Sequence, residues 1–343
     1  MSGVIKLRIL PLVVVLFLPA DLRGAPPRDV VASIFPVSSD EKCWRMLPPA
    51  EKGGGQALPI WARTMAGAMP RTTAAMLRLD YLHRTRNPLG PELRGKMRWV
   101  AGRANDCEYS MAYAEADLRR AGVDETELRS LKGEHRNLPE LELAALEFAH
   151  QMTVDASKVT DAEVARLLAS YGEQKVVAMV LLLAHANFQD RMLLALGSSL
   201  EPGGPLPPLE IEFNLKTEPP PAVPPRKRAE GRPVPDEPTR VDDPFWLSMA
   251  FDDLQGRLTE QRQRPSRIRI PSWEEVLRVM PPEVPRPEKP TRIQWNLVTT
   301  GYQPELATAW SNTTRAFREE SKQDRVFEES LFWIVTRTIH CFY

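Results

Sequence analysis

Apolar residues recur every three or four positions along most of this chain, which is the spacing of one face of an α-helix. One such run spans residues 97–122 and includes a cysteine. Its apolar face contains Trp99, Val100, Ala104, Cys107, Met111, Ala114 and Leu118. We predict one helix there, or a pair of helices broken near Asn105-Asp106, with Gly122 as the stop. Cys107 then lies on the buried face, where an unpaired thiol is usually a small core residue.

Residues 59–86 have an apolar stripe that Pro70 interrupts. The interruption predicts two helices there instead of one. Residues 139–152 predict an amphipathic helix. Thr160 and Glu163 form a capping box for a helix that ends near Tyr171-Gly172.

Residues 176–196 are apolar for about the length of a membrane span. Polar residues interrupt this segment, namely His185, Asn187, Gln189, Asp190 and Arg191. We therefore predict a helix buried at the domain centre or at a subunit interface, in an all-α protein.

A second copy of the Cys107 region lies at the C-terminus. A shift of 234 positions without gaps pairs Trp61 with Trp295, Gly67 with Gly301, Pro70 with Pro304, Ala75 with Ala309, Arg84 with Arg318, Trp99 with Trp333, Arg103 with Arg337, Cys107 with Cys341 and Tyr109 with Tyr343. Two matched tryptophan pairs and a matched cysteine indicate a tandem duplication. We predict a first domain over 39–200, a proline-rich linker over 201–243 and a second, incomplete domain over 244–343.

The N-terminal residues have the layout of a secretory signal peptide. Lys6 and Arg8 precede an apolar run over residues 9–18, and small residues follow it. The run is about half of the ~20 residues that a membrane-spanning helix needs. We therefore expect a signal peptide over 1–25 and export to the periplasm or the medium. A cytoplasmic location is the alternative, and no stable membrane span is expected.

Composition and charge fit a globular protein, with 43% apolar and 26% charged residues. Forty-five basic and forty-five acidic residues give no formal net charge, so nothing favours nucleic acid or an anionic membrane as a partner. Three cysteines cannot all pair within one chain. Cys43 aligns with Val276 in the repeat, and we interpret it as structural.

The residues around the aligned cysteines resemble the carboxymuconolactone decarboxylase and AhpD-like alkylhydroperoxidase family, which has an all-helical fold and the motif Glu-x11-Cys-x2-Cys-x3-His. Glu329 stands twelve residues before Cys341, as the motif requires, and the chain ends before the position of the second thiol. In the first repeat the four motif positions hold Gly95, Cys107, Ser110 and Ala114. The first copy therefore keeps only one motif residue.

The resemblance implies an antioxidant, thiol-dependent peroxidase of the peroxiredoxin type, with a peroxide-type substrate and a thiol reductant as partners. One thiolate is oxidised to a sulfenic acid, which a second thiol resolves as a disulfide while a carboxylate and a histidine relay protons. Cys341 would be the attacking or resolving thiol and Glu329 its carboxylate, and Cys107 is a partner if the two cysteines meet. His340 would lower the pKa of Cys341 if it is protonated nearby, although adjacent helical residues point ~100° apart. No metal, nucleotide or other cofactor is implied.

Two other functions stay open. One is a noncatalytic helical module in which the first repeat is a dimerisation scaffold, and the other is lactone decarboxylation, the family's other activity. His185 is either a general base beside a thiol or a hydrogen-bonded core histidine, and we predict the second role for it and for His83, His135 and His150.

The second repeat ends where the first has roughly 90 further residues to cover its thiol helix. We expect Trp333, Ile334 and Phe342 to form an exposed apolar surface unless they dock on the first repeat or on another chain. An intramolecular pseudo-dimer or a homo-oligomer is therefore predicted. Our hypothesis is a truncated form of a longer two-domain protein whose next residue would be cysteine.

Overall fold

The computed structural model describes residues 35–133, 138–215, 250–282 and 289–338, together with Val284 and Arg286. Helices account for nearly all of the regular structure in these ranges, which confirms the predicted all-α class. The predicted signal peptide, most of the proline-rich linker, and His135, His340 and Cys341 lie outside the described residues.

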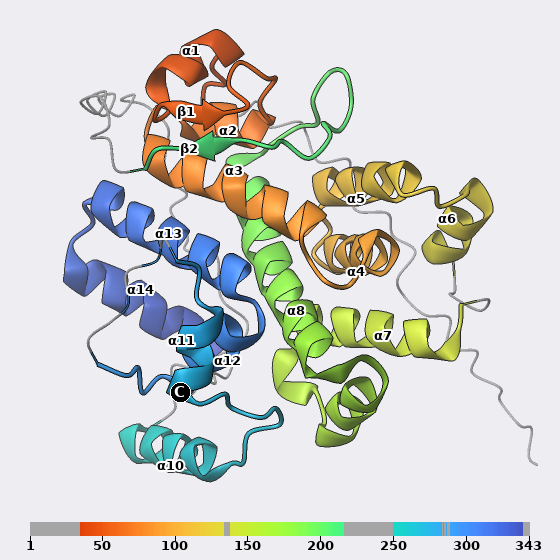
Figure 1. The fold of residues 1–343 in the computed structure, drawn as a ribbon, viewed down its shortest axis with the longest axis vertical. Coiled ribbons are helices and arrows are strands. Elements are labelled where there is room, and N and C mark those ends of the chain that lie inside the picture. The colour runs from red at the N-terminus through yellow and green to blue at the C-terminus, as the bar shows by residue number, and fades with distance from the viewer. Residues whose placement is uncertain are drawn as a thin grey trace, which may run out of the picture.

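The first repeat contains α1 (Asp40–Met46), α2 (Ile60–Met65), α3 (Pro70–Thr85), α4 (Pro91–Ala104), α5 (Glu108–Arg120), α6 (Glu125–Lys132), α7 (Glu140–Val154), a 3-10 turn (Ala156–Lys158) and α8 (Asp161–Leu196). The second contains α10 (Phe251–Gln263), α11 (Trp273–Val279), α12 (Gln294–Tyr302), α13 (Pro304–Ser321) and α14 (Arg325–Thr338). Two short strands, β1 (Ala50–Lys52) and β2 (Glu212–Phe213), pair antiparallel. Figure 1 shows α8 running through the centre. α1–α7 lie around one end and one side of α8, and α11–α14 lie on its other side.

The Cys107 region is a pair of helices, as one of the two sequence alternatives predicts. α4 ends at Ala104, Asp106 adopts a left-handed conformation with φ of 54°, and Cys107 is the N-cap of α5. Pro70 and Pro91 occupy the first positions of α3 and α4, where a helix has no use for their missing N–H.

α8 consists of two helical stretches that meet at a kink, and the first of them ends near Tyr171-Gly172, as predicted. Thr160 and Glu163 form the predicted capping box at its start, and the interruption lies at Gly172, whose φ of 74° favours glycine. Among the described helices, α8 is the one long and apolar enough to cross a membrane, and 44% of its apolar window is buried inside the protein.

The main core forms where α4 packs against α5, α7 and α8. One buried lysine, Lys96, joins this core to α6 and α7 through ion pairs with Glu127 and, at 2.6 Å, with Glu142. The site described below lies beside this core.

The two repeats contact each other through equivalent helices. α12, α13 and α14 begin 234 positions after α2, α3 and α4, and α13 packs along α3 (Figure 1). Glu320 near the end of α13 accepts hydrogen bonds at 2.7 Å from the backbone N–H groups of Arg71 and Thr72, at the start of α3. The two helices are therefore antiparallel.

Residues 201–215, which we predicted as the start of the linker, pack on the first repeat instead. Glu201 is buried and accepts hydrogen bonds from the Ile60 N–H at 2.9 Å and from the Tyr109 hydroxyl at 2.7 Å. Leu209 and Ile211 are also buried, and β2 pairs with β1. A proline-rich segment does not form a helix, but it can still pack on a domain. The change in composition therefore put the predicted start of the linker too early in the chain.

α14 has an apolar face open to solvent. Val326, Phe327 and Phe332 are exposed, and Trp333 and Ile334 are 49% and 38% exposed. The equivalent face of α4 is covered by α5, α7 and α8. The expected exposed surface on the second repeat is present, while Phe342 lies beyond the part that the structure describes.

Candidate functional site

Cys107 lies at the start of α5 with its sulfur turned into the protein. The residue is 1% exposed, and its thiol donates to the Ser110 hydroxyl at 3.3 Å. Burial raises the pKa of Cys107 and the negative charge of Asp190 raises it further, while hydrogen bonding with Ser110 and the Arg98 charge offset only part of this rise. The thiol form is therefore favoured over the reactive thiolate.

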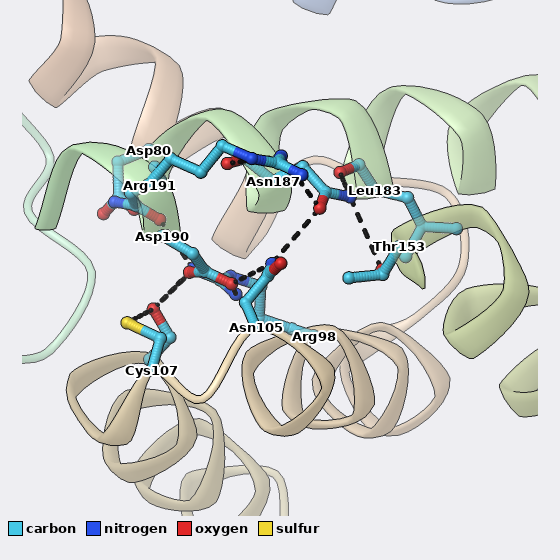
Figure 2. Close-up of polar contacts among 11 residues, drawn as sticks. Asp80, Arg98, Asn105, Cys107, Thr153, Leu183, Asn187, Asp190 and Arg191 are labelled. Carbon is cyan, nitrogen blue, oxygen red and sulfur yellow. Dashed lines mark hydrogen bonds and ion pairs between the residues drawn. The ribbon is translucent and has the colours of Figure 1, made fainter. Parts of the chain in front are cut away.

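Asp190, on α8, is the centre of the hydrogen-bond network around this thiol (Figure 2). It is fully buried and accepts from the Ser110 hydroxyl at 2.5 Å, from Arg98 Nη1 at 3.0 Å and from Asn105 Nδ2 at 2.9 Å. Burial raises the pKa of Asp190, but the Arg98 charge and these hydrogen bonds outweigh it and hold the pKa below its usual value. Asp190 and Arg98 therefore form a buried ion pair in which each charge compensates the other.

The network extends from Asp190 in two directions. Arg98 also donates to Gln189 Oε1 at 3.1 Å, and Gln189 Nε2 donates to Asp80 Oδ1 at 3.2 Å on α3. Asn105 Nδ2 donates to Asn187 Oδ1 at 3.2 Å (Figure 2). Polar groups from α3, α4, α5 and α8 are thus joined, and such a satisfied network fixes the relative positions of the helices.

Two histidines stack on each other beside this network. The rings of His83 and His185 are 4.4 Å apart and nearly parallel, and both residues are buried. Burial, with the Arg98 charge as the second cause, lowers the pKa of His185 to about 3, and burial also lowers that of His83. Both rings are neutral at pH 7.

The predicted burial is right for His83 and His185 but wrong for His150, which is exposed on α7, and the predicted hydrogen bonding of the two buried rings is not complete. Within the described ranges, neither ring nitrogen of His185 and not Nδ1 of His83 has a hydrogen-bond partner. The thiol of Cys107 bonds to Ser110 and to neither histidine.

A cavity of about 550 Å³, counted with its open mouth, lies between α3, α4, α5 and α8. Its wall is formed by Trp61, Asp80, His83, Arg84, Arg94, Gly95, Arg98, Tyr109, Ser110, Tyr113, Ala114, Asp117, Leu182, His185 and Gln189. Gly95, Ser110 and Ala114 are three of the four positions that match the family motif. The fold therefore brings the motif positions to one cavity without the motif's side chains.

The remaining predicted site residues lie elsewhere. Glu329 is on the surface of α14, where its 62% exposed side chain is 3.5 Å from Arg325. His340 and Cys341 lie past the last described residue. Cys43 is fully buried in α1, where its thiol lies 3.7 Å from the Arg63 carbonyl oxygen, which agrees with a structural role.

The sequence interpretation missed Arg94, Arg98 and the role of Asp190. Their signal was present, because a charged residue within an apolar helical run must find a partner when the run is buried. The sequence did not show that Asp190 and Arg98 would pair with each other, or that Arg94 would pair with no carboxylate among the described residues.

No group of histidine, cysteine or acidic residues among the described positions is arranged to hold a metal ion. No protein-family model, curated protein or solved structure matches the chain.

Proposed function

We propose that this chain is an AhpD-like helical protein whose first repeat is a noncatalytic module that carries the second repeat. The observation that supports this proposal is the state of the motif positions. They surround one cavity, yet they hold Gly95, Ser110 and Ala114 beside a buried Cys107. Three of the four motif positions line the cavity, and none of these three holds the side chain that the family's thiol chemistry uses.

Three features argue against peroxidase chemistry at Cys107. Its burial and the nearby Asp190 favour the unreactive thiol. Ser110, at the position of the second thiol, cannot form a disulfide. At Gly95 a Cβ would lie 2.7 Å from the Leu118 side chain, so the motif's glutamate does not fit this packing.

Contacts between the repeats support the module role. Leu79 and Leu82 of α3 form an apolar cluster with Leu306 and Ala309 of α13. The Trp310 ring packs edge-on against Phe188 of α8 at 5.7 Å. Tyr302 donates to Glu173 at 2.5 Å, and Gln303 to the Gln174 carbonyl at 2.9 Å. Apolar and polar contacts together hold α12 and α13 on the first repeat.

Thiol peroxidase chemistry in the second repeat is the second candidate. It is supported by α14, which begins and ends 234 positions after α4 and so puts Glu329 at the position equivalent to Gly95. Cys341 follows twelve residues later, as in the family motif. In this candidate Cys341 is the attacking or resolving thiol, with a thiol reductant in solution.

Trapping of sulfenic acid separates the two candidates. The native chain is treated with hydrogen peroxide and dimedone, and the label on each of the three cysteines is measured by mass spectrometry. We expect no label on Cys107 in the folded protein and labelling after unfolding in urea. Native labelling of Cys107 would contradict the noncatalytic proposal.

The same experiment tests the second repeat. Labelling of Cys341, with consumption of peroxide that Cys341→Ser abolishes and Cys107→Ser leaves unchanged, would establish thiol chemistry there. If Cys341 is not labelled and no peroxide is consumed, the noncatalytic module remains as the proposed function of both repeats.

A further inference from the structure

The cavity between α3, α4, α5 and α8 contains one arginine that the fold does not use. Arg84 donates to both carboxylate oxygens of Asp117, at 2.8 Å each, and Arg98 pairs with Asp190. Arg94, the third arginine in the wall, has no acceptor for its guanidinium among the residues that the structure describes. Two of the three cavity arginines are therefore compensated and one is not.

Arg94 is nevertheless buried, with 8% of its surface exposed. The carboxylate of Asp117 is already used by Arg84 and by Arg120, which donates at 2.8 Å. Burial lowers the pKa of Arg94, although a guanidinium keeps its charge in proteins. An unpaired buried charge is unfavourable, so an anion in the cavity would supply what the chain does not.

The stacked histidines form an uncharged part of the same cavity wall. His185 is 2% exposed and lines the same cavity, yet both its ring nitrogens lack partners in the described chain. A neutral imidazole offers one N–H donor and one lone pair.

The rest of the wall selects the shape of that molecule. Trp61, Tyr109 and Tyr113 supply aromatic rings, and the two tyrosine rings stack at 4.6 Å. Leu182 and Ala114 add aliphatic surface. The space is small, and its mostly apolar lining suits the flat hydrocarbon body of a single ring.

We propose that this cavity binds a small organic carboxylate, with Arg94 as the anchor of the carboxylate and the aromatic rings around the apolar body. The fork of a guanidinium matches a carboxylate with two parallel hydrogen bonds. An inorganic phosphate would leave the aromatic wall without a contact. This site goes beyond the module function and does not need a reactive thiol.

Isothermal titration calorimetry of the full chain at pH 7 tests the proposal, with benzoate as the probe. We expect saturable binding with one site per chain. Benzamide, which has the same ring without the charge, and inorganic phosphate, which has the charge without the ring, should each bind at least about tenfold more weakly.

Arg94→Met should weaken benzoate binding by about tenfold or more, because the charge-assisted hydrogen bonds are lost. The matched control is Arg45→Met on the exposed face of α1, which should leave binding unchanged. Arg94→Met should also raise the melting temperature of the ligand-free chain, since it removes an unpaired buried charge.

Absence of saturable benzoate binding would overturn the proposal, as would equal affinity for benzamide or unchanged affinity in Arg94→Met. If Arg94→Met does not fold, Arg94→Lys replaces it, because lysine keeps the charge and loses the fork. Weaker benzoate binding by Arg94→Lys supports the anchor role, and full affinity contradicts it.

Discussion

Asp190 organises the centre of the first repeat. It is a fully buried carboxylate on α8, and it accepts hydrogen bonds from Arg98, Asn105 and Ser110. Each donor comes from a different segment, so one side chain links α8 to α4, to the turn after it and to α5. Cys107 reaches this network only through Ser110.

Removing this carboxylate should be costly. We expect Asp190→Ala to lower the free energy of unfolding by about 3–5 kcal/mol, because Arg98 is left as a buried, unpaired charge. The double variant Asp190→Leu with Arg98→Met should lose less, since it leaves no charge behind. Urea unfolding of both variants measures the difference, and an equally large loss in the double variant would show that packing, not charge, explains the effect.

The buried histidines should make the protein sensitive to acid. The pKa of His185 falls from 6.5 in its usual state to about 3 when folded, so the unfolded chain binds more protons between these values. Stability contributed by the neutral ring is complete above pH 6.5 and is lost as the pH falls towards 3.

For His185 alone, the loss of unfolding free energy between pH 7 and pH 5 should be about 2 kcal/mol. His185→Leu should reduce the measured loss by that amount, because leucine binds no proton. The control is His150→Leu at an exposed position of α7, which should retain the full loss. Identical pH dependence in His185→Leu and the unmodified chain would contradict the assignment.

At the scale of elements, the contact of α4 with α5 depends on a glycine. The Leu118 side chain occupies the space that a Cβ at position 95 would take, with 2.7 Å between the two. The packing of Leu118 therefore requires glycine at position 95. The sequence pattern of α4 does not show this requirement for glycine, because Leu118 lies on the next helix, α5.

Gly95→Ala should therefore destabilise the protein by about 1–3 kcal/mol, although alanine is the better helix former. Gly256→Ala is the matched control, since Gly256 is also inside a helix and has open space around its Cβ position. It should be neutral or raise stability by up to about 1 kcal/mol. Thermal or urea unfolding of both variants decides, and a stabilising Gly95→Ala would contradict the close approach.

At the scale of the whole molecule, each repeat stabilises the other. Glu320 of α13 acts as the cap of α3, where it accepts from two backbone N–H groups and, at 2.6 Å, from the Thr72 hydroxyl. A helix start has unsatisfied N–H groups and a partial positive charge, which explains why a carboxylate is favourable there. The second repeat thus completes a helix of the first.

Glu320→Ala should lower the unfolding free energy by about 1–2 kcal/mol and speed hydrogen exchange in the first turn of α3. Glu319→Ala is the comparison, because Glu319 also pairs with Arg71 but is 44% exposed. Its loss should cost less than about 1 kcal/mol. Unchanged exchange at Arg71 and Thr72 in Glu320→Ala would mean that the repeats are not coupled through this cap.

The sequence by itself determined the all-α class, several helix starts and the shift of 234 positions that relates α2–α4 to α12–α14. These depend on apolar spacing, on proline at positions 70 and 91 and on the cap at Thr160, which act within a few residues. The resemblance also identified Cys107 and its neighbouring motif positions as one group.

Only the tertiary structure decided what that group does. Ser110 meets Asp190 across 80 positions of sequence, and Arg98 meets it across 92. Helical spacing predicts the position of Arg94 on α4 as readily as that of Arg98, yet Arg94 pairs with no carboxylate in the part of the chain that the structure describes. Helical periodicity predicts which side chains turn inward but not what they face, because partners so far apart in sequence are chosen by the packing of whole helices.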